Sequence, residues 1–191
     1  MIAAVVLAAG LARRMGRQKL LLQLQGKPVV RWSVEHVLGH VEDVVVVTGP
    51  EDTAIREALG DLAVRFTVNP RPQDGQGTSI AAGVTALKPW TTAVVIALGD
   101  QPRMPKTVVP ALLETLRRSG KAIVAPVYQG VQGTPVVFSS DVFGELRVLK
   151  GDAGARAVVK ENPERVETVA FDLAMPPDVD TPEDYAKLHV Q

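Results

Sequence analysis

A short basic loop, Ala8 to Lys19 (AAGLARRMGRQK), holds the residues of this chain with the clearest chemical potential. Its small residues Ala8, Ala9 and Gly10 let backbone amides come close to a flat base or to a phosphate. Arg14 and Lys19 can neutralise phosphates, arginine with a planar fork and lysine with a point charge. The loop predicts contact with a phosphorylated ligand, and a merely solvated basic loop is the alternative.

The spacing within this loop excludes two common phosphate-binding motifs. A Walker A loop needs Gly-Lys-Ser/Thr after four variable residues, and the dinucleotide fingerprint needs Gly-x-Gly-x-x-Gly. Neither pattern is present between Ala8 and Lys19. The sequence therefore disfavours a nicotinamide-dependent oxidoreductase with a Rossmann fold.

Two acidic turns supply the complementary charge. Asp100 follows the apolar run 93–98, and Asp178 and Asp180 precede a Thr-Pro pair that is typical of a helix start. An aspartate after a strand can bind Mg²⁺, a hard cation that takes few carboxylates and keeps water and phosphate oxygens. The alternatives are a plain turn at Asp100 and helix capping near Asp180. A basic loop with two acidic turns provides what phosphoryl-type transfer requires.

Alternation of short apolar runs with helical patterns predicts an α/β fold with a mostly parallel sheet and helices on both faces. In such sheets ligands bind beyond the carboxyl ends of the strands, near a topological switch point. We expect strands at Ile2–Leu7, Asp43–Thr48, Val64–Val68, Ala93–Leu98, Ala122–Pro126, Pro135–Phe138 and Val166–Phe171. We expect helices at Pro28–Leu38, Pro50–Leu59, Thr78–Leu87, Lys106–Arg118, Asp141–Leu149 and Gly154–Lys160, and one starting at Thr181.

Length and composition indicate one domain spanning residues 1–191, with about 130–160 as a lid or acceptor-substrate subregion. The chain is 46% hydrophobic, and its 21 basic and 21 acidic residues give zero net charge. No global field therefore favours nucleic acid or an anionic membrane. The absence of cysteine excludes disulfides and thiol catalysis. No apolar run is long enough to span a bilayer, and no basic region opens the sequence, so we expect a cytoplasmic protein.

The ordered motifs together resemble a known family. Ala8-Ala9-Gly10-x-x-x-Arg14-Met15-Gly16-x-x-Lys19 resembles the signature of nucleotidyltransferases with a Rossmann-like, glycosyltransferase-A-type fold. The further motifs are Lys19-Leu20-Leu21-Leu22, Gly77-Thr78-Ser79-Ile80-Ala81-Ala82-Gly83, Gly99-Asp100-Gln101-Pro102, Gly151-Asp152-Ala153-Gly154-Ala155-Arg156 and Asp178-Val179-Asp180-Thr181-Pro182-Glu183-Asp184-Tyr185. With them the chain is similar to the molybdenum cofactor cytidylyltransferase branch. That resemblance implies three layers and one antiparallel late strand in the sheet.

The resemblance also implies roles for individual residues. Catalysis would involve Arg14, Lys19 and Asp100, and Mg²⁺ would be held by Asp100 with Asp180 as the second ligand. The nucleotide would be bound by Ala8, Ala9, Gly10, Arg14, Gly16, Lys19, Asn69, Ser79, Gly99 and Asp100. The acceptor would lie near Gly151, Asp152 and Arg156.

The expected reaction transfers CMP from CTP to the molybdenum-molybdopterin cofactor and releases pyrophosphate. Guanylyltransferase relatives tend to carry Gly-Gly where this chain has Ala9-Gly10, which favours cytidine. The family often has Ser or Thr at Ala12, so one hydroxyl contact to phosphate is missing. The expected partners are CTP, a phosphorylated pterin-type molecule and a molybdenum hydroxylase or its chaperone, without nucleic acid or membrane. Alternatives are a GTP-using guanylyltransferase, a cytidylyltransferase for another phosphorylated acceptor, and a non-catalytic nucleotide- and cofactor-binding accessory protein.

Overall fold

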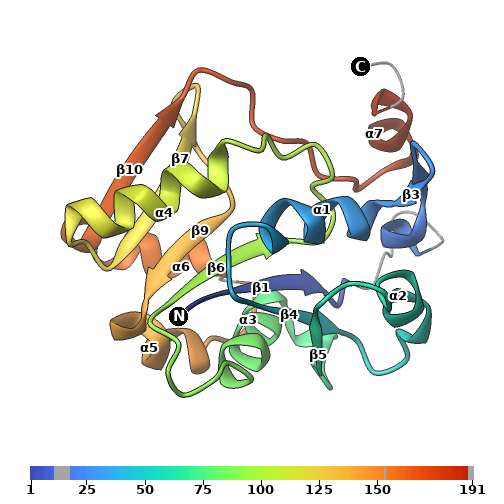
Figure 1. Ribbon diagram of the computed structural model, residues 1–191, viewed down its shortest axis with the longest axis horizontal. Helices are drawn as coiled ribbons and strands as arrows, with labels where there is room; N and C mark the ends of the chain where they lie inside the picture. Colours follow the sequence, from blue (N-terminus) through green and yellow to red (C-terminus); the bar gives the residue numbers. More distant parts are fainter. Residues whose placement is uncertain (11–17, 153, 189–191) are drawn as a thin grey trace.

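A mostly parallel sheet forms the middle of the molecule (Figure 1). The computed structural model describes residues 1–10, 18–152 and 154–188. The sheet order is β10-β7-β9-β6-β1-β4-β5, and the short β8 pairs with β7. The strands are β1 (Ile2–Ala8), β4 (Asp43–Thr48), β5 (Arg65–Val68), β6 (Ala93–Leu98), β7 (Ile123–Tyr128), β8 (Val131–Gln132), β9 (Val136–Ser139) and β10 (Val166–Phe171).

The direction of the strands confirms the fold expected from the resemblance. β9 is antiparallel to both of its neighbours, β6 and β7, whereas β10 runs parallel to β7. β8 is also antiparallel to β7. β1 lies between β4 and β6 in the sheet. After β1 the chain forms β4 and β5 on one side of β1 and then crosses to the other side to form β6. The switch point of the sheet is therefore between β1 and β6.

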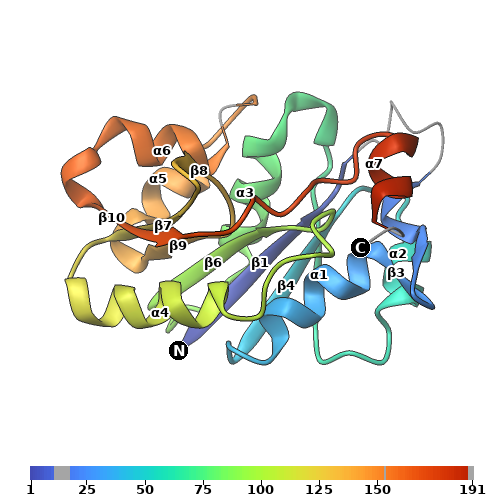
Figure 2. The ribbon, with the colours of Figure 1, turned by 90° about the horizontal axis from the view of Figure 1, so that it is seen from above.

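Helices cover both faces of the sheet and complete the three layers (Figure 2). One face carries α1 (Val29–Leu38) and α4 (Val108–Ser119), and the other carries α3 (Gln76–Thr85), α5 (Phe143–Arg147) and α6 (Ala155–Glu161). α2 (Thr53–Ala58) and α7 (Pro182–Lys187) lie near the end of the sheet to which β1 points. The Thr181 hydroxyl accepts from the Asp184 amide in a capping box, as its sequence predicts for a helix start.

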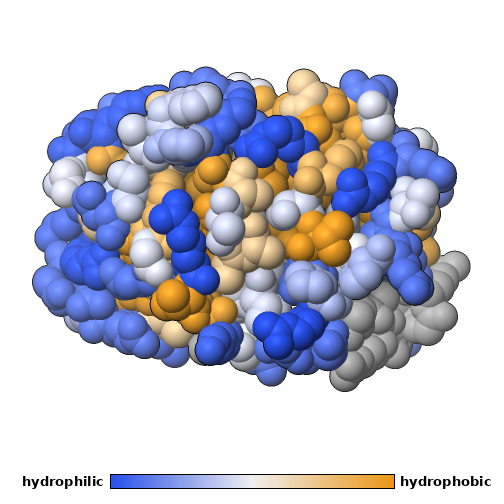
Figure 3. All heavy atoms as spheres, turned by 90° about the horizontal axis from the view of Figure 1, so that it is seen from below, coloured by the Kyte–Doolittle hydropathy of each residue, from blue (hydrophilic) through white to orange (hydrophobic). Residues whose placement is uncertain are grey.

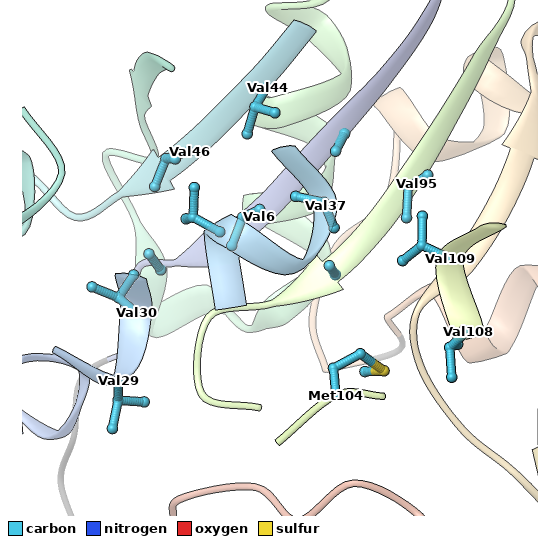
Figure 4. Close-up of a cluster of buried hydrophobic side chains, with 14 of the residues drawn as sticks. Val6, Val29, Val30, Val37, Val44, Val46, Val95, Met104, Val108 and Val109 are labelled. Atoms are coloured by element: carbon cyan, nitrogen blue, oxygen red, sulfur yellow. The ribbon is translucent and has the colours of Figure 1, made fainter. Parts of the chain in front are cut away.

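Two apolar cores result, one on each face of the sheet. Alternate residues of each strand point to opposite faces, so Val6 and Val46 face α1 while Val5 and Val45 face α3. Figure 4 shows the first core, in which Val30 and Val37 of α1 meet strand valines. All six residues of β4 are buried, which explains its almost continuous valine sequence.

Some elements differ from the sequence prediction. A two-stranded ribbon, β2 (Gln23–Leu24) and β3 (Lys27–Pro28), was not expected, and its turn uses positive φ angles at Gln25 (51°) and Gly26 (78°). α2 starts at Thr53 rather than Pro50, α3 at Gln76 rather than Thr78, and α4 at Val108 rather than Lys106. Within the range 130–160, β9 is an inner strand of the main sheet, so this part of the proposed subregion belongs to the central fold.

The molecular surface is mixed in character. Figure 3 shows hydrophilic residues around an apolar middle on the face seen from below, where the β5 edge of the sheet lies. Two large apolar side chains with substantial exposure are Val68 of β5 (40%) and Trp90 (65%). Among the described residues, the helices are all too short or too polar to cross a membrane.

Candidate active site

A cavity lies where β1 and β6 end, at the switch point of the sheet. Its volume is about 520 Å³, which suits a nucleotide-sized ligand. Its described lining residues are Leu7, Ala9, Gly10, Lys19, Leu20, Pro72, Gln73, Gly75, Gln76, Ser79, Leu98, Asp100, Asp152, Asp178 and Asp180. Residues from several distant segments thus meet at the position where open α/β sheets bind ligands.

The turn that carries Asp100 is fixed by its neighbours. The Gly99 amide donates to the Leu7 carbonyl (2.9 Å), and the Ser33 hydroxyl of α1 donates to the Gly99 carbonyl (3.0 Å). A Cβ atom on Gly99 would lie 2.8 Å from the Leu7 oxygen, so a side chain there would force the turn away from β1. Gly99 therefore positions the turn, although the cavity is not lined by Gly99 itself.

One lysine joins the two acidic turns. Lys19 begins a short 3-10 helix (Lys19–Leu21), and its Nζ lies 2.6 Å from Asp100 Oδ2 and 2.7 Å from Asp180 Oδ1. Burial of the ammonium opposes its charge, but the two carboxylates outweigh this and raise the pKa of Lys19. Lys19 therefore stays protonated at neutral pH and is held at the carboxylates.

The same two carboxylates fit a divalent ion of the Mg²⁺ type. Asp100 and Asp180 both place an oxygen on a single cation, Lys19 Nζ. In the described part of the chain, no cluster of three or more His, Cys, Asp or Glu residues forms a metal cage. Magnesium commonly uses one or two carboxylates and completes its shell with water and substrate phosphates. The donor set therefore suits a metal whose shell is completed by water and, when a triphosphate is bound, by its phosphate oxygens.

A third aspartate, Asp178, lines the cavity, and a buried glutamine, Gln101, contacts it from behind. Burial and the nearby charge of Asp100 raise the pKa of Asp178. The Gln101 amide donates to Asp178 Oδ1 (2.8 Å) and is almost fully buried. Sequence reasoning placed Asp178 in the second acidic turn without a separate role, and it assigned no role to Gln101. Their adjacency to Asp100 and Asp180 is a signal that could have found them.

The two residues expected to fix base and sugar have different positions. Ser79 lines the cavity. Asn69 is buried (2% exposed), and its amide donates to the hydroxyls of Thr78 (2.8 Å) and Ser79 (2.9 Å). Asn69 Oδ1 accepts from the Arg71 amide (3.0 Å), so Asn69 joins the end of β5 to the start of α3. In this structure Asn69 orients Ser79 and is outside the lining of the cavity.

The expected acceptor residues are only partly gathered at the cavity. Gly75, at φ 101°, lies so close to Gly151 that an added Cβ would be 2.2 Å from the Gly151 carbonyl carbon. The Gly77 amide donates to the Gly151 carbonyl (2.9 Å). Asp152 lines the cavity, whereas Arg156 is exposed on α6 and outside its lining.

The remaining expected residues divide between the cavity rim and the undescribed part of the chain. Ala9 and Gly10 line the cavity, while Ala8 is buried at the end of β1. Arg14 and Gly16, and with them Ala12, lie outside the described residues. Gln73 and Gln76 line the cavity and were missed, although Gln76 directly precedes the Gly77-Thr78 motif and Gln73 lies four residues before it.

Comparison with known proteins agrees with this geometry. Residues 4–166 match the family model described as a MobA-like NTP transferase domain. The purine catabolism protein PucB of Bacillus subtilis (strain 168) is 32% identical over 192 residues, covering 95% of this chain and 92% of PucB. The molybdenum cofactor cytidylyltransferase of Escherichia coli (strain K12) is 25% identical over 184 residues, with coverage of 95% and 92%. Rv0371c of Mycobacterium tuberculosis H37Rv, in a crystal structure with manganese, superposes with a TM-score of 0.84 at 28% identity, with coverage of 98% and 97%.

Proposed function

Because this chain belongs to the MobA-like NTP transferase family and is a nucleotidyltransferase, we propose that it transfers CMP from CTP to the molybdenum-molybdopterin cofactor. The observation that supports this most directly is the ammonium of Lys19 between the carboxylates of Asp100 and Asp180. These groups meet in a cavity at the switch point of the sheet. Opposite charges gathered there can hold both a metal ion and the phosphates of a triphosphate.

The proposed reaction is an in-line displacement at the α-phosphorus. An oxygen of the acceptor's terminal phosphate forms a new bond to that phosphorus. The bond from the α-phosphorus to the oxygen that bridges to the β-phosphate breaks, and pyrophosphate leaves with the bonding electrons. The attacking oxygen is already anionic at neutral pH, so no general base is required. Catalysis then depends on positioning and on charge stabilisation.

Residues around the cavity would divide this work. When bound, Mg²⁺ would neutralise triphosphate charge, and Asp100 and Asp180 would hold it. Lys19 would stabilise charge on the α-phosphate, and Arg14 would stabilise the departing pyrophosphate. The manganese-containing neighbour supports a divalent metal, and Mg²⁺ is our choice because of the all-oxygen donor set.

The nucleotide and the acceptor would enter from different parts of the cavity. Ala9, Gly10 and Ser79 line the cavity and would contact the base and sugar, and the methyl group of Ala9 would favour cytosine. Asp152 also lines the cavity, near α3 through the Gly151–Gly77 hydrogen bond, and would contact the acceptor. The acceptor would be a phosphorylated pterin, and a molybdenum hydroxylase or its chaperone would receive the product in the cytoplasm.

The relatives leave two features of the substrate open to direct test. The Bacillus subtilis relative, at 32% identity, is named for purine catabolism, and the Escherichia coli relative, at 25% identity, is named for the molybdenum cofactor. A GTP-dependent reaction and a different phosphorylated acceptor are the competing enzymatic functions. Pyrophosphate release should be measured with CTP, GTP, ATP and UTP, each with Mg²⁺ and with molybdenum cofactor, a sugar phosphate or a polyol phosphate. We expect release with CTP and molybdenum cofactor. A higher kcat/KM with GTP or with a sugar phosphate would refute the substrate assignment.

A further inference from the structure

The segment that carries Asp178 and Asp180 has little regular structure of its own. Residues 172–181 connect β10 at one edge of the sheet to α7 on the opposite side of the molecule (Figure 1). No helix or strand fixes the position of this crossing segment. Even so, Asp180 lies close enough to Asp100 for both carboxylates to contact the same cation, Lys19 Nζ. The position of the second acidic turn therefore depends on a few specific contacts.

Besides the Lys19–Asp180 ion pair and the buried side chain of Val179, Gln101 supplies side-chain hydrogen bonds that hold this segment. Its Nε2 donates to Asp178 Oδ1 (2.8 Å) and, at a longer distance, to the Pro176 carbonyl (3.4 Å). Its Oε1 accepts from the Thr134 hydroxyl (2.8 Å), just before β9. The backbone adds one bond, from the Val179 amide to the Asp100 carbonyl (3.0 Å). Gln101 therefore links the Asp100 turn, the entry to β9 and the crossing segment.

We propose that Gln101 is a positioning residue that sets the spacing between Asp100 and Asp180, so that both carboxylates reach one divalent ion. This inference rests on the metal use in the proposed function. Gln101 is 3% exposed and does not line the cavity, so it acts through Asp178 and not on substrate. Asp178 is the point at which Gln101 holds the segment, two residues before the ligand Asp180.

The amide side chain is the type that this position requires. Asp100, Asp178 and Asp180 interact as like charges, which pushes the crossing segment away from the Asp100 turn. The amide of Gln101 adds a donor to Asp178 without adding a fourth negative charge. A buried amide with both ends bonded is also held in one orientation, because leaving either end unpaired would cost free energy. Glutamate at 101 would keep the shape but place an acceptor against the Asp178 carboxylate.

The test measures Mn²⁺ affinity of the full-length protein without nucleotide or acceptor, by the electron paramagnetic resonance signal of free Mn²⁺. The variants are Gln101→Met, Gln101→Glu and the double variant Gln101→Glu with Asp178→Asn, which restores a donor–acceptor pair with its direction reversed. Gln132→Met is the matched control, because Gln132 is a half-buried glutamine on β8 outside this network. Thermal unfolding of each variant reports whether the fold is kept.

We expect Gln101→Met and Gln101→Glu to weaken Mn²⁺ binding about 10- to 100-fold, as is common when a residue that orients a metal ligand is lost. Gln132→Met should bind as the wild type does, and the double variant should recover most of the affinity that Gln101→Glu loses. An affinity of Gln101→Met within twofold of the wild type would overturn the inference. A double variant that binds no better than Gln101→Glu would overturn it as well.

Two further results keep the test decisive. If the Gln101 variants do not fold, Thr134→Val removes only the hydroxyl that donates to Gln101, and we expect a smaller weakening of Mn²⁺ binding. Unchanged binding in Thr134→Val would then contradict the inference. Wild-type protein that binds Mn²⁺ but transfers no CMP would refute the proposed substrate and leave the role of Gln101 standing. CMP transfer with an unchanged Gln101→Met affinity would refute only the role of Gln101.

Discussion

Two charge clusters lie at opposite ends of the parallel strands, and they are built in opposite ways. At the carboxyl ends, one cation, Lys19, contacts two anions, Asp100 and Asp180. At the amino ends, one anion, Asp43, contacts two cations: Arg65 Nε at 2.9 Å and Lys88 Nζ at 3.5 Å. The residues of the first cluster line the cavity, whereas those of the second join the first residues of β4 and β5.

The difference separates groups kept for chemistry from groups kept for stability. The hydrogen bonds from Arg65 lower the pKa of Asp43, so the folded state favours its ionised form. Burial and the neighbouring Asp100 instead raise the pKa of Asp178, because negative charges are crowded at the cavity. Crowding of like charge is costly in a folded protein and suits a site that receives a metal ion. We expect mutations in the two clusters to affect different measurable properties.

The largest expected effect comes from Asp100, the proposed principal metal ligand. Asp100→Asn keeps the shape of the turn and removes one carboxylate charge. We expect the rate of CMP transfer to fall about 100- to 1000-fold. The lost Asp100 carboxylate would hold the metal ion, and the metal ion would stabilise charge in the transition state. The thermal unfolding midpoint should change little, because the weaker contact with Lys19 is offset by reduced crowding with Asp178 and Asp180. Pyrophosphate release and thermal unfolding are the measurements, and near-native turnover would contradict the metal assignment.

Lys19→Met is expected to have the next largest effect. The substitution removes the ammonium that contacts both carboxylates and keeps much of the apolar stem. We expect about a 100-fold loss of kcat/KM for CTP. In metal-free buffer the unfolding midpoint should fall, because Asp100 and Asp180 lose their shared cation, and added Mg²⁺ should restore part of that loss. A variant with unchanged kinetics would exclude Lys19 from catalysis.

Mutations in the cluster of Asp43, Arg65 and Lys88 should lower stability and leave activity nearly unchanged. Asp43→Ala leaves Arg65 and Lys88 without their carboxylate, and we expect the free energy of unfolding to fall by about 1 to 2 kcal/mol. The Arg65 side chain is 41% exposed, so solvent screening keeps the effect small. The kcat for CMP transfer should remain within about twofold of the wild type once the protein is folded. Denaturant unfolding and steady-state kinetics on the same preparation test both parts, and a large kinetic defect would break the comparison.

The pH dependence of stability gives an independent test of the same cluster. The pKa of Asp43 is lowered from its ordinary value of 3.8, so the unfolded state binds a proton more readily than the folded state. Its contribution to stability is therefore fully present above about pH 4 and is lost as the pH falls through the folded pKa. Asp43→Asn should flatten the acid side of the stability profile. An unchanged profile between pH 2 and 5 would show that Asp43 is not the responsible group.

The smallest expected effect concerns the choice of base. Ala9→Gly removes the one methyl group by which this chain differs from the guanylyltransferase pattern at that position. We expect the ratio of kcat/KM for CTP to that for GTP to fall about tenfold or less, since one methyl group discriminates weakly. Gly10 is unchanged and keeps the close approach of the backbone. A ratio that does not move would mean that base choice is made elsewhere in the cavity.

The fold was largely predictable because strand and helix periods are local properties. Valine-rich β4 and the Thr181-Pro182 helix start are recognisable without any neighbours. The β2–β3 ribbon was not, because its strands have two residues each and its turn places a glutamine, Gln25, at positive φ. The early start of α3 at Gln76 was hidden by the flanking glycines Gly75 and Gly77, which both lie close to Gly151.

The charged residues of the site were predictable from the sequence, whereas the hydrogen bonds between its segments were less so. Lys19, Asp100 and Asp180 were recognised by type and by position after strands, and the structure brings them together. The role of Asn69 behind Ser79 depends on how the end of β5 meets α3, because Ser79 is 10 residues further along the chain than Asn69. Gln101 reaches a residue 77 positions away, so only the folded chain reveals the contact with Asp178.

The central claim is nucleotidyl transfer at the cluster of Lys19, Asp100 and Asp180. The most direct measurement follows the label from CTP labelled at the α-phosphate into molybdenum cofactor, with Mg²⁺, for wild type, Asp100→Asn and Asp43→Asn. We expect one equivalent of pyrophosphate per labelled acceptor with wild type and Asp43→Asn, and almost none with Asp100→Asn. Label transfer that persists in Asp100→Asn, or is absent from the wild type with every triphosphate and phosphorylated acceptor tested, would contradict the account.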